Sequence, residues 1–488
     1  MKLRRFLCGI LCAALLLGSA MFPVEAKTCN CGEIVQIFME GFGSSLYYDY
    51  GTPEQRRAEM AETDNLAFGI GRLFRGVRHG LWQRSWDPVA GGISSLMFNI
   101  MGHLAMDEQG RSIAPISEQW RIDPEQDHRE RPEFRFHYDF RIDPFEAADQ
   151  LNEFVEAVVK ATGHSKVALT AHSQGAIIIM TYLKMYGTKR LDSFIMINGA
   201  WQGLTLVGEL FTGQFGISGA SVTSFIANGD DGSGNLKRAM ALLRDSRLLD
   251  FLEPWGEDII DKMGDQLYDE TLLPLFGSMP IIWAFVPSEY YPEARKLLVG
   301  KPEYRQLLAK ADRYQNEVQS QAGKLLKNAM AKGVKVAVIG GYGFSPTPVT
   351  KNATYQCDSL IDTSYATGGA TSAPIGETLP PSNSKYRSPD GIFDASTCLL
   401  PDQTWFVKNV EHSAGPSRAL RQWIIHSKKQ PTIYDNAKFP QYLVVTDEED
   451  TTWLDGESVY TAPLQEEPAV PFTGTFFEAS RRFVQTLW

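Results

Sequence analysis

Short apolar runs recur along the chain, and polar segments of helical periodicity separate several of them. The strand-like runs cover residues 33–38, 134–141, 166–172, 194–197, 334–339 and 404–408. Asp143-Pro144 opens a stretch in which apolar residues repeat with a helical period up to Val159. Strands that alternate with helices in this way predict a mostly parallel sheet flanked by helices, an α/β fold.

The stretch 166–187 joins an apolar strand, a tight turn around Ser173 and an apolar helix that ends at Gly187. Ala171 and Gly175 flank the serine, which gives the pattern A-x-S-x-G, close to G-x-S-x-G. This arrangement is typical of the nucleophile elbow of serine hydrolases, where the turn exposes the hydroxyl and the helix N-terminus points at the reaction centre. The alternative is an ordinary strand-to-helix turn that contains a serine.

A serine nucleophile needs a base, and one histidine has the right position in the chain. His412 follows Ser173 and lies in a loop after the predicted strand 404–408. His172 is fixed beside the serine and His426 lies within a predicted helix, whereas the remaining histidines precede the elbow. The sequence therefore predicts His412 as the general base.

The acid that orients this base is expected in a turn before the same strand. Asp390 is the first candidate and Asp394 the reserve. The order serine, acid, histidine is that of α/β-hydrolases. Negative charge on the substrate oxygen is expected to be held by the backbone N–H groups of Phe42, in a glycine-rich turn, and of Gln174.

The strand pattern stops between residues 201 and 332, which predicts an inserted, mainly helical cap domain. Leu210 and Phe211 lie on a glycine-interrupted apolar segment that suits a mobile lid. Trp283 and Phe285 lie in a second apolar run that could line an acyl groove. These four residues are the expected substrate contacts, and the alternative is that they pack the core of the cap.

The composition of the chain predicts the remaining domain boundaries. Residues 1–26 carry basic residues, an apolar run and small residues at a cleavage position, which predicts a secretory signal peptide and a secreted or periplasmic protein. The alternative is a retained membrane anchor. Residues 27–200 and 333–429 form the two parts of the expected hydrolase core, and 430–488 read as an irregular extension. The net charge of −11 disfavours binding to nucleic acid.

Four cysteines lie beyond the predicted signal peptide. Cys357 and Cys398 are expected to form a disulfide, since exported chains favour them. Cys29 and Cys31 are too close in sequence to bond without strain. No other histidine or cysteine stands near them in the sequence, so the sequence predicts no metal site and no cofactor.

Several motifs resemble those of the lecithin:cholesterol acyltransferase-like α/β-hydrolases, which include lysosomal phospholipase. They are Y-D-F-R at 138–141, A-H-S-Q-G at 171–175, N-G-A-W-Q-G at 198–203, S-M-P at 278–280 with V-P-S at 286–288, and G-F-S-P-T-P at 343–348. Asp390-Gly391 and His412 match the acid and base of that family. Met39-Glu40-Gly41 departs from its usual Pro-Gly.

The resemblance implies transfer of an acyl group from a lipid ester, through an acyl-serine, to water or to an alcohol. We therefore expect a lipase, phospholipase or O-acyltransferase that contacts a membrane or lipid-particle surface transiently. An esterase for small soluble esters is one alternative. A catalytically inactive hydrolase fold that acts as a binding protein is another.

Overall fold

The computed structural model describes the central part of the chain with several gaps. The described residues are 29, 31–43, 46–48, 57–58, 72, 75–76, 78–79, 87–114, 116–117, 133–214, 266–346, 354–412, 418–445 and 451–453. The predicted signal peptide, much of the predicted lid segment and most of the C-terminal extension lie outside these residues.

An eight-stranded sheet in the order β13-β12-β11-β8-β7-β6-β1-β5 forms the centre of the described structure. Its strands are β1 (Val35–Met39), β5 (Glu133–Phe136), β6 (Val167–His172), β7 (Leu191–Ile197), β8 (Lys335–Tyr342), β11 (Thr404–Lys408), β12 (Tyr442–Val445) and β13 (Thr451–Trp453). All neighbouring strands pair in parallel except β12 and β13, which are antiparallel. The predicted mostly parallel sheet is confirmed.

Helices cover both faces of this sheet. They are α4 (Pro144–Thr162), α5 (Gly175–Tyr186), α14 (Ala322–Ala331) and α16 (Arg418–His426). Val336 and Val338 of β8 belong to the core that includes α4, α5 and α14, whereas Ala337 and Ile339 pack with α16 on the other face. Because both faces are covered, β8 is buried along its whole length, which explains its continuous apolar sequence.

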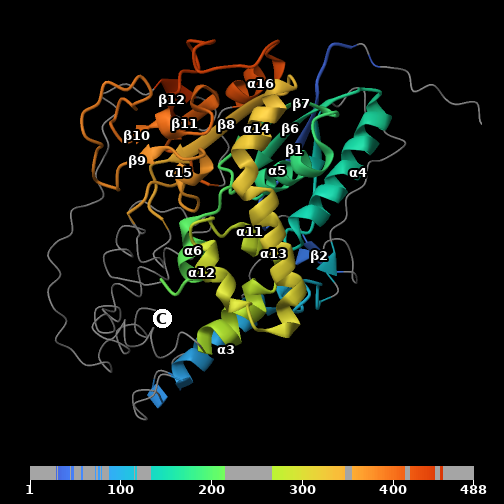
Figure 1. Cartoon of the computed structure of the whole chain (residues 1–488), viewed down its shortest axis with the longest axis vertical. Helices are drawn as coiled ribbons and strands as arrows, with labels where there is room; N and C mark the ends of the chain where they lie inside the picture. The colour runs from blue at the N-terminus through green and yellow to red at the C-terminus, as the bar shows by residue number, and fades with distance from the viewer. Residues whose placement is uncertain are drawn as a thin grey trace, which may run out of the picture.

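Helical segments occupy the described chain between β7 and β8. They are α6 (Thr205–Leu210), η4 (Tyr268–Gly277), α11 (Pro280–Ala284), α12 (Tyr291–Ala294), η5 (Arg295–Leu297), η6 (Pro302–Tyr304), α13 (Arg305–Glu317), η7 (Gln319–Gln321) and α14. The insertion is mainly helical, as predicted, and α11, α12 and α13 lie together below the sheet in Figure 1. Its last helix, α14, packs on α5 and β8 and so belongs to the layer that covers the sheet.

Smaller elements surround this framework. They are β2 (Leu46–Tyr48), β3 (Arg57–Ala58), α3 (Asp87–Met101), η1 (Gly102–Leu104), β4 (Ile116–Ser117), α15 (Thr363–Ala366), β9 (Thr371–Ser372), β10 (Phe393–Asp394), η8 (Ala395–Thr397) and η9 (Pro401–Gln403). The expectation that the chain after residue 430 is irregular is wrong for β12 and β13, which extend the sheet. Short strands at a sheet edge carry too few residues to show a period.

The central β6–turn–α5 unit, the parallel sheet and the helical insertion together make this an α/β-hydrolase fold. Within the described part of the chain, no helix combines the length and the apolar character that crossing a bilayer requires.

Candidate active site

Ser173 occupies a sharp turn between β6 and α5. Its φ of 55° lies in the left-handed region, which residues other than glycine rarely adopt. Two hydrogen bonds fix this conformation: the Ser173 N–H donates to the Ile197 carbonyl at 3.0 Å, and the Ala200 N–H donates to the Ser173 carbonyl at 3.1 Å. The backbone strain of a nucleophile elbow is therefore present and is held by the end of β7.

His412 reaches Ser173 from the loop after β11. Its Nε2 lies 3.0 Å from Ser173 Oγ, within hydrogen-bond distance. The chain leaves β11 through Asn409, whose φ is 60° and whose N–H donates to the Tyr342 carbonyl at 2.8 Å. This turn redirects the chain so that the imidazole faces the serine, as the sequence predicted for this pair.

Asp358, rather than a residue near 390, lies against the other side of the imidazole. Its Oδ2 is 2.8 Å from His412 Nδ1, and its side chain is 1% exposed. The second oxygen accepts from the N–H groups of Leu360 at 3.0 Å and Ile361 at 2.7 Å. Ser359, with a φ of 88°, makes the turn that brings both N–H groups to this carboxylate.

The prediction that Asp390 or Asp394 contacts His412 is wrong. Asp390 accepts a hydrogen bond from the Tyr342 hydroxyl at 2.8 Å and pairs with Lys408 Nζ at 3.3 Å. Asp394 caps η8 by accepting from the Ser396 N–H at 2.9 Å. Both aspartates stabilise the loops that precede β11, and neither faces the imidazole.

The predicted disulfide between Cys357 and Cys398 is not formed. The Cys357 thiol donates to the Phe344 carbonyl at 3.3 Å, whereas Cys398 interacts with the Thr367 hydroxyl. Burial raises the pKa of both thiols, that of Cys398 to about 12. Cys357 therefore serves as a buried neighbour of Asp358 and not as a covalent crosslink.

His172 supports His412 from the elbow itself. Its Nε2 lies 2.5 Å from the carbonyl oxygen of His412, and the two rings are 4.7 Å apart. Burial, together with the nearby His412, lowers the pKa of His172 to about 4. His172 is thus neutral near pH 7, so Nε2 carries a proton that it donates to this carbonyl.

The glycine-rich turn after β1 passes directly beside the nucleophile. A Cβ at Gly41 would lie 2.6 Å from Ser173 Cβ, so only glycine fits at this point. Phe42, the expected oxyanion donor, stacks edge-on against Phe140 at 4.5 Å between ring centres. Gln174 precedes the first residue of α5, where the backbone N–H groups have no acceptor within the helix.

The Y-D-F-R motif fixes this turn. The Tyr138 hydroxyl donates to the Glu40 carbonyl at 3.0 Å, immediately before Gly41. Arg141 is fully buried and binds Asp139 through Nε at 2.9 Å and Nη2 at 2.7 Å. A two-point guanidinium–carboxylate contact is geometrically rigid, so the motif positions the loop that faces Ser173.

The predicted substrate contacts fall into different surroundings. Phe211 and Trp283 are buried and pack edge-on at 5.0 Å between ring centres, which fits the alternative that they form the core of the cap. Leu210 is half-buried on α6. Phe285 is buried 6.0 Å from the Phe42 ring, so it is the predicted contact that packs against the expected oxyanion turn.

The loop that supplies Asp358 also reaches the cap. Asp362 accepts hydrogen bonds from the Thr205 N–H at 2.9 Å and from its hydroxyl at 2.5 Å. Burial raises the pKa of Asp362 to about 7. Residues 358–362 therefore connect the imidazole at one end to the first turn of α6 at the other.

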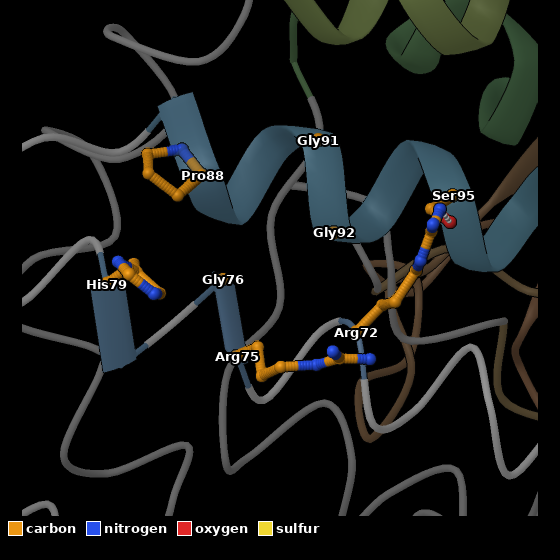
Figure 2. Close-up of a pocket in the computed structure, with 8 residues that line it drawn as sticks. All are labelled: Arg72, Arg75, Gly76, His79, Pro88, Gly91, Gly92 and Ser95. Carbon is orange, nitrogen blue, oxygen red and sulfur yellow. Dashed lines mark hydrogen bonds between the residues drawn. The ribbon is translucent and has the colours of Figure 1, made fainter.

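A separate pocket of about 340 Å³ lies along α3, far along the chain from the triad residues. Arg72, Arg75 and His79 face it from one side, and Ser95 of α3 accepts a hydrogen bond from Arg72 at 2.9 Å (Figure 2). None of its lining residues belongs to the Ser173–His412–Asp358 cluster.

Asp358 and His172 are the site residues that sequence reasoning missed. Asp358 and Asp390 both lie between β8 and β11, so chain order does not separate them. The available signal was Lys408, a charged residue at the buried end of an apolar strand. A buried ammonium group needs a carboxylate partner, and Asp390 is the partner of Lys408. Asp390 is therefore not free to orient His412, and Asp358 takes that position.

Comparisons with known proteins add little to this geometry. No protein-family model matches the chain, and no curated protein matches it. Among solved structures, one described as "The crystal structure of Tle4-Tli4 complex" is similar over 63% of this chain and 74% of that chain, at 12% identity and a TM-score of 0.23. A similarity this low carries no argument about fold or activity.

Proposed function

We propose that the protein is a serine hydrolase or O-acyltransferase that cleaves lipid esters through an acyl-serine intermediate. The observation that carries the proposal is the continuous hydrogen-bonded chain from Ser173 Oγ through His412 to Asp358. A strained serine, an imidazole within reach and a buried carboxylate on the opposite ring nitrogen are the parts that acyl transfer requires.

In the proposed reaction, Ser173 Oγ attacks the ester carbonyl carbon while His412 Nε2 takes the hydroxyl proton. The same nitrogen then gives that proton to the leaving alkoxide, which breaks the ester bond and leaves the acyl-serine. Asp358 accepts the Nδ1–H of His412, which keeps Nε2 unprotonated at the start and stabilises the imidazolium that forms.

The charge on the tetrahedral intermediate would be stabilised by the backbone N–H groups of Phe42 and Gln174. Support comes from the position of Gly41 against Ser173 and from the location of Gln174 at the amino end of α5. A helix amino end carries a partial positive charge, which favours a developing oxyanion. Water or an alcohol then attacks the acyl-serine, and His412 acts as base again.

A lipid is the favoured acyl donor because apolar side chains pack against the proposed oxyanion turn. Phe42 contacts both Phe140 and Phe285, which provides an apolar wall suited to an acyl chain. The net charge of −11 opposes attraction to anionic lipid surfaces, so hydrophobic contact would dominate. The family resemblance of the sequence points to the same substrate class.

Labelling with a fluorophosphonate probe tests the nucleophile. The wild-type chain should be labelled once, and Ser173→Ala should not be labelled, whereas Ser320→Ala, which changes an exposed serine in η7, should be labelled normally. Ester hydrolysis by Ser173→Ala should fall by several orders of magnitude. Retained labelling of Ser173→Ala would contradict the assignment of the nucleophile.

The substrate class needs a second measurement with the same wild-type protein. Hydrolysis of phosphatidylcholine vesicles, followed by mass spectrometry of the released fatty acids, is compared with hydrolysis of a short soluble ester. The proposal expects a higher kcat/KM on the vesicle lipid. A chain that cleaves only the soluble ester is a small-molecule esterase, and a chain that cleaves neither and resists the probe is a binding protein.

A further inference from the structure

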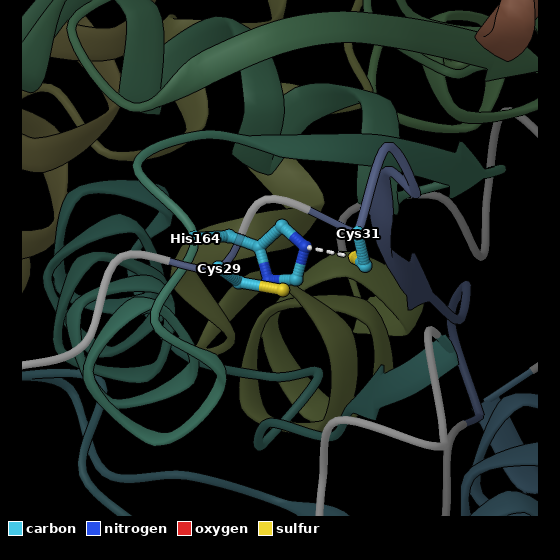
Figure 3. A group of neighbouring side chains, drawn as sticks. All are labelled: Cys29, Cys31 and His164. Carbon is cyan, nitrogen blue, oxygen red and sulfur yellow. Dashed lines mark hydrogen bonds between the residues drawn. The ribbon is translucent and has the colours of Figure 1, made fainter.

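Two cysteines and a histidine from distant parts of the chain meet at the end of α4 that lies away from Ser173. Cys29, Cys31 and His164 each offer one ligand atom, and these atoms all lie within 4.8 Å of one another. Figure 3 shows both sulfur atoms next to the imidazole ring. His164 is 133 positions from Cys31, which is why the sequence alone shows no cluster.

The separation of the Cys31 and His164 ligand atoms fits a tetrahedral ion. Cys31 Sγ is 3.4 Å from His164 Nε2. Bonds of about 2.3 Å to sulfur and about 2.0 Å to nitrogen at a tetrahedral angle place the two ligand atoms roughly 3.5 Å apart. The observed separation therefore needs little movement to accept an ion between the two atoms.

The backbone holds these side chains in place from both directions. The Cys29 N–H donates to the Gly163 carbonyl at 2.9 Å, and Gly163, with a φ of 71°, ends α4. The His164 N–H donates to the Thr162 hydroxyl at 3.4 Å. The segment before β1 is thus already attached to the α4–β6 connection without any ion.

His164 also carries an unmet hydrogen-bonding demand. Its Nδ1 is buried and has no hydrogen-bond partner in the part of the chain that the structure describes. An imidazole binds an ion through one nitrogen, so coordination through Nε2 leaves Nδ1 without a partner, and the proposed site rests on the positions of the three ligand atoms.

The geometry points to a binding site formed by Cys29, Cys31 and His164. The site would hold one cation that prefers sulfur ligands, such as Zn²⁺. Thiolate and imidazole are the ligands that Zn²⁺ prefers, and three protein ligands leave one tetrahedral position for water. Cys31 is exposed, so the ion has a path from solvent. The sequence predicts no metal site here because His164 is 133 positions from Cys31, and the fold brings the three side chains together.

The site is structural and does not take part in ester cleavage. It lies before β1 and β6, at their amino ends, whereas Ser173, His412 and Asp358 lie beyond the carboxyl ends of β6, β11 and β8. A bound ion would link the segment before β1 to the α4–β6 connection. Binding to the native state alone stabilises that state in proportion to the logarithm of the free ion concentration.

A disulfide between Cys29 and Cys31 is the competing fate of the two thiols. One residue separates them, so a bond between them carries strain. The structure leaves both outside any disulfide, with Cys31 Sγ directed at the imidazole. These contacts favour the ion over the covalent bond.

The test uses the reduced, chelator-treated full-length protein after removal of any signal peptide, titrated with Zn²⁺ by calorimetry. The wild-type chain is expected to bind one Zn²⁺ per chain, and Co²⁺ in its place should give thiolate-to-metal charge-transfer absorption. His164→Ala and Cys31→Ser should each weaken Zn²⁺ binding at least about tenfold. His426→Ala, which changes an exposed histidine at the end of α16, is the matched control and should bind normally.

Thermal unfolding gives the second measurement. Zn²⁺ should raise the Tm of the wild-type chain and of His426→Ala but not that of His164→Ala, while hydrolysis of a short soluble ester stays unchanged in all three. Unchanged Zn²⁺ affinity in His164→Ala, absence of Zn²⁺ binding by the wild-type chain, or recovery of natively expressed protein with Cys29 bonded to Cys31 would each overturn the proposal.

Discussion

The side chains of Asp358 and Asp390 are both buried, but one carboxylate faces an imidazole and the other faces an ammonium group. The first contact orients the proposed base, because it fixes which ring nitrogen carries the proton. The second neutralises a charge inside the protein, so it acts on stability. Two aspartates between β8 and β11 therefore have different roles: Asp358 orients the proposed base, and Asp390 contributes to stability.

Substitution of each aspartate by asparagine should separate these roles. Asp358→Asn should lower kcat on a short ester by about 10⁴-fold, because the amide favours the wrong tautomer of His412. Asp390→Asn should keep most of kcat and lower the free energy of unfolding by about 3–5 kcal/mol, because it removes the charge opposite Lys408. Initial rates and urea unfolding of both variants provide the check.

The opposite pattern would return the acid role to Asp390. An inactive but stable Asp390→Asn, together with a fully active Asp358→Asn, would mean that the observed contact between Asp358 and His412 is not the catalytic one. Asp394→Asn serves as the control, since Asp394 caps a short helix and faces neither His412 nor Lys408.

His172 makes folding stability depend on pH. Its pKa is lowered from 6.5 to about 4, mainly by burial, so the folded state resists protonation that the unfolded state accepts. Its contribution is complete above pH 6.5 and is lost as the pH falls from 6.5 towards 4, by up to about 3 kcal/mol. His172→Gln keeps a donor for the His412 carbonyl but does not titrate.

The difference between wild type and His172→Gln isolates this effect from all other titrations. Urea unfolding at pH 7 and at pH 4.5 should show a smaller loss of stability in His172→Gln than in the wild type. Equal losses in the two proteins would mean that His172 is protonated in the folded state at the lower pH.

At the scale of elements, the carboxyl ends of the paired strands β1 and β6 lie side by side, next to Ser173. Gly41 follows β1 and lies so close to Ser173 that a methyl group cannot fit. The packing of these two parallel strands, paired from Val35–Val167 to Met39–Ala171, therefore fixes the distance between the expected oxyanion turn and the nucleophile.

Gly41→Ala should lower kcat at least about tenfold while leaving the fold intact, because the new methyl displaces the Ser173 side chain. Gly91→Ala is the matched control, since the Cβ there meets nothing within 4 Å and α3 gains a better helix former, worth up to about 1 kcal/mol. Ester hydrolysis and circular dichroism of both variants are the measurements. A fully active Gly41→Ala would show that the turn can move away from Ser173.

The elements that the sequence predicted well are those whose pattern is long or chemically constrained. The elbow was found because Ala171 and Gly175 mark a close crossing of strand and helix, and β11 was found at residues 404–408. The strands β12 and β13 were missed because edge strands of this length show no period. Asp358 was missed because its role depends on which loop between β8 and β11 meets His412 in space, and the charged Lys408 indicates a carboxylate partner without showing which aspartate supplies it.

At the scale of the whole molecule, the described core holds together without a disulfide between Cys357 and Cys398. Both residues are buried, at 0% and 6% exposed, so little of either thiol is open to solvent in the folded state. Stability in this region comes from apolar packing, in which Cys398 lies with Phe393 and Phe406, and not from a covalent crosslink.

Alkylation of the metal-free protein should distinguish these thiols from an exposed one. Cys31 should react with iodoacetamide under native conditions, whereas Cys357 and Cys398 should react only after addition of urea, because burial both shields them and raises their pKa. Peptide mapping by mass spectrometry follows each site. A bridged peptide that contains Cys357 and Cys398 would contradict the prediction.

The pairing of β7 with β8 has a consequence for how the chain folds. Ile197 lies opposite Ile339, so this central contact must close a loop that contains the whole helical insertion. Contacts between residues so distant in sequence form slowly, and until β8 arrives the apolar edge of β7 is open to pairing with other chains. Ser173 and His412 are 239 positions apart and meet only after that closure. During refolding, the return of esterase activity should therefore lag behind the return of secondary structure, and low protein concentration should favour recovery over aggregation.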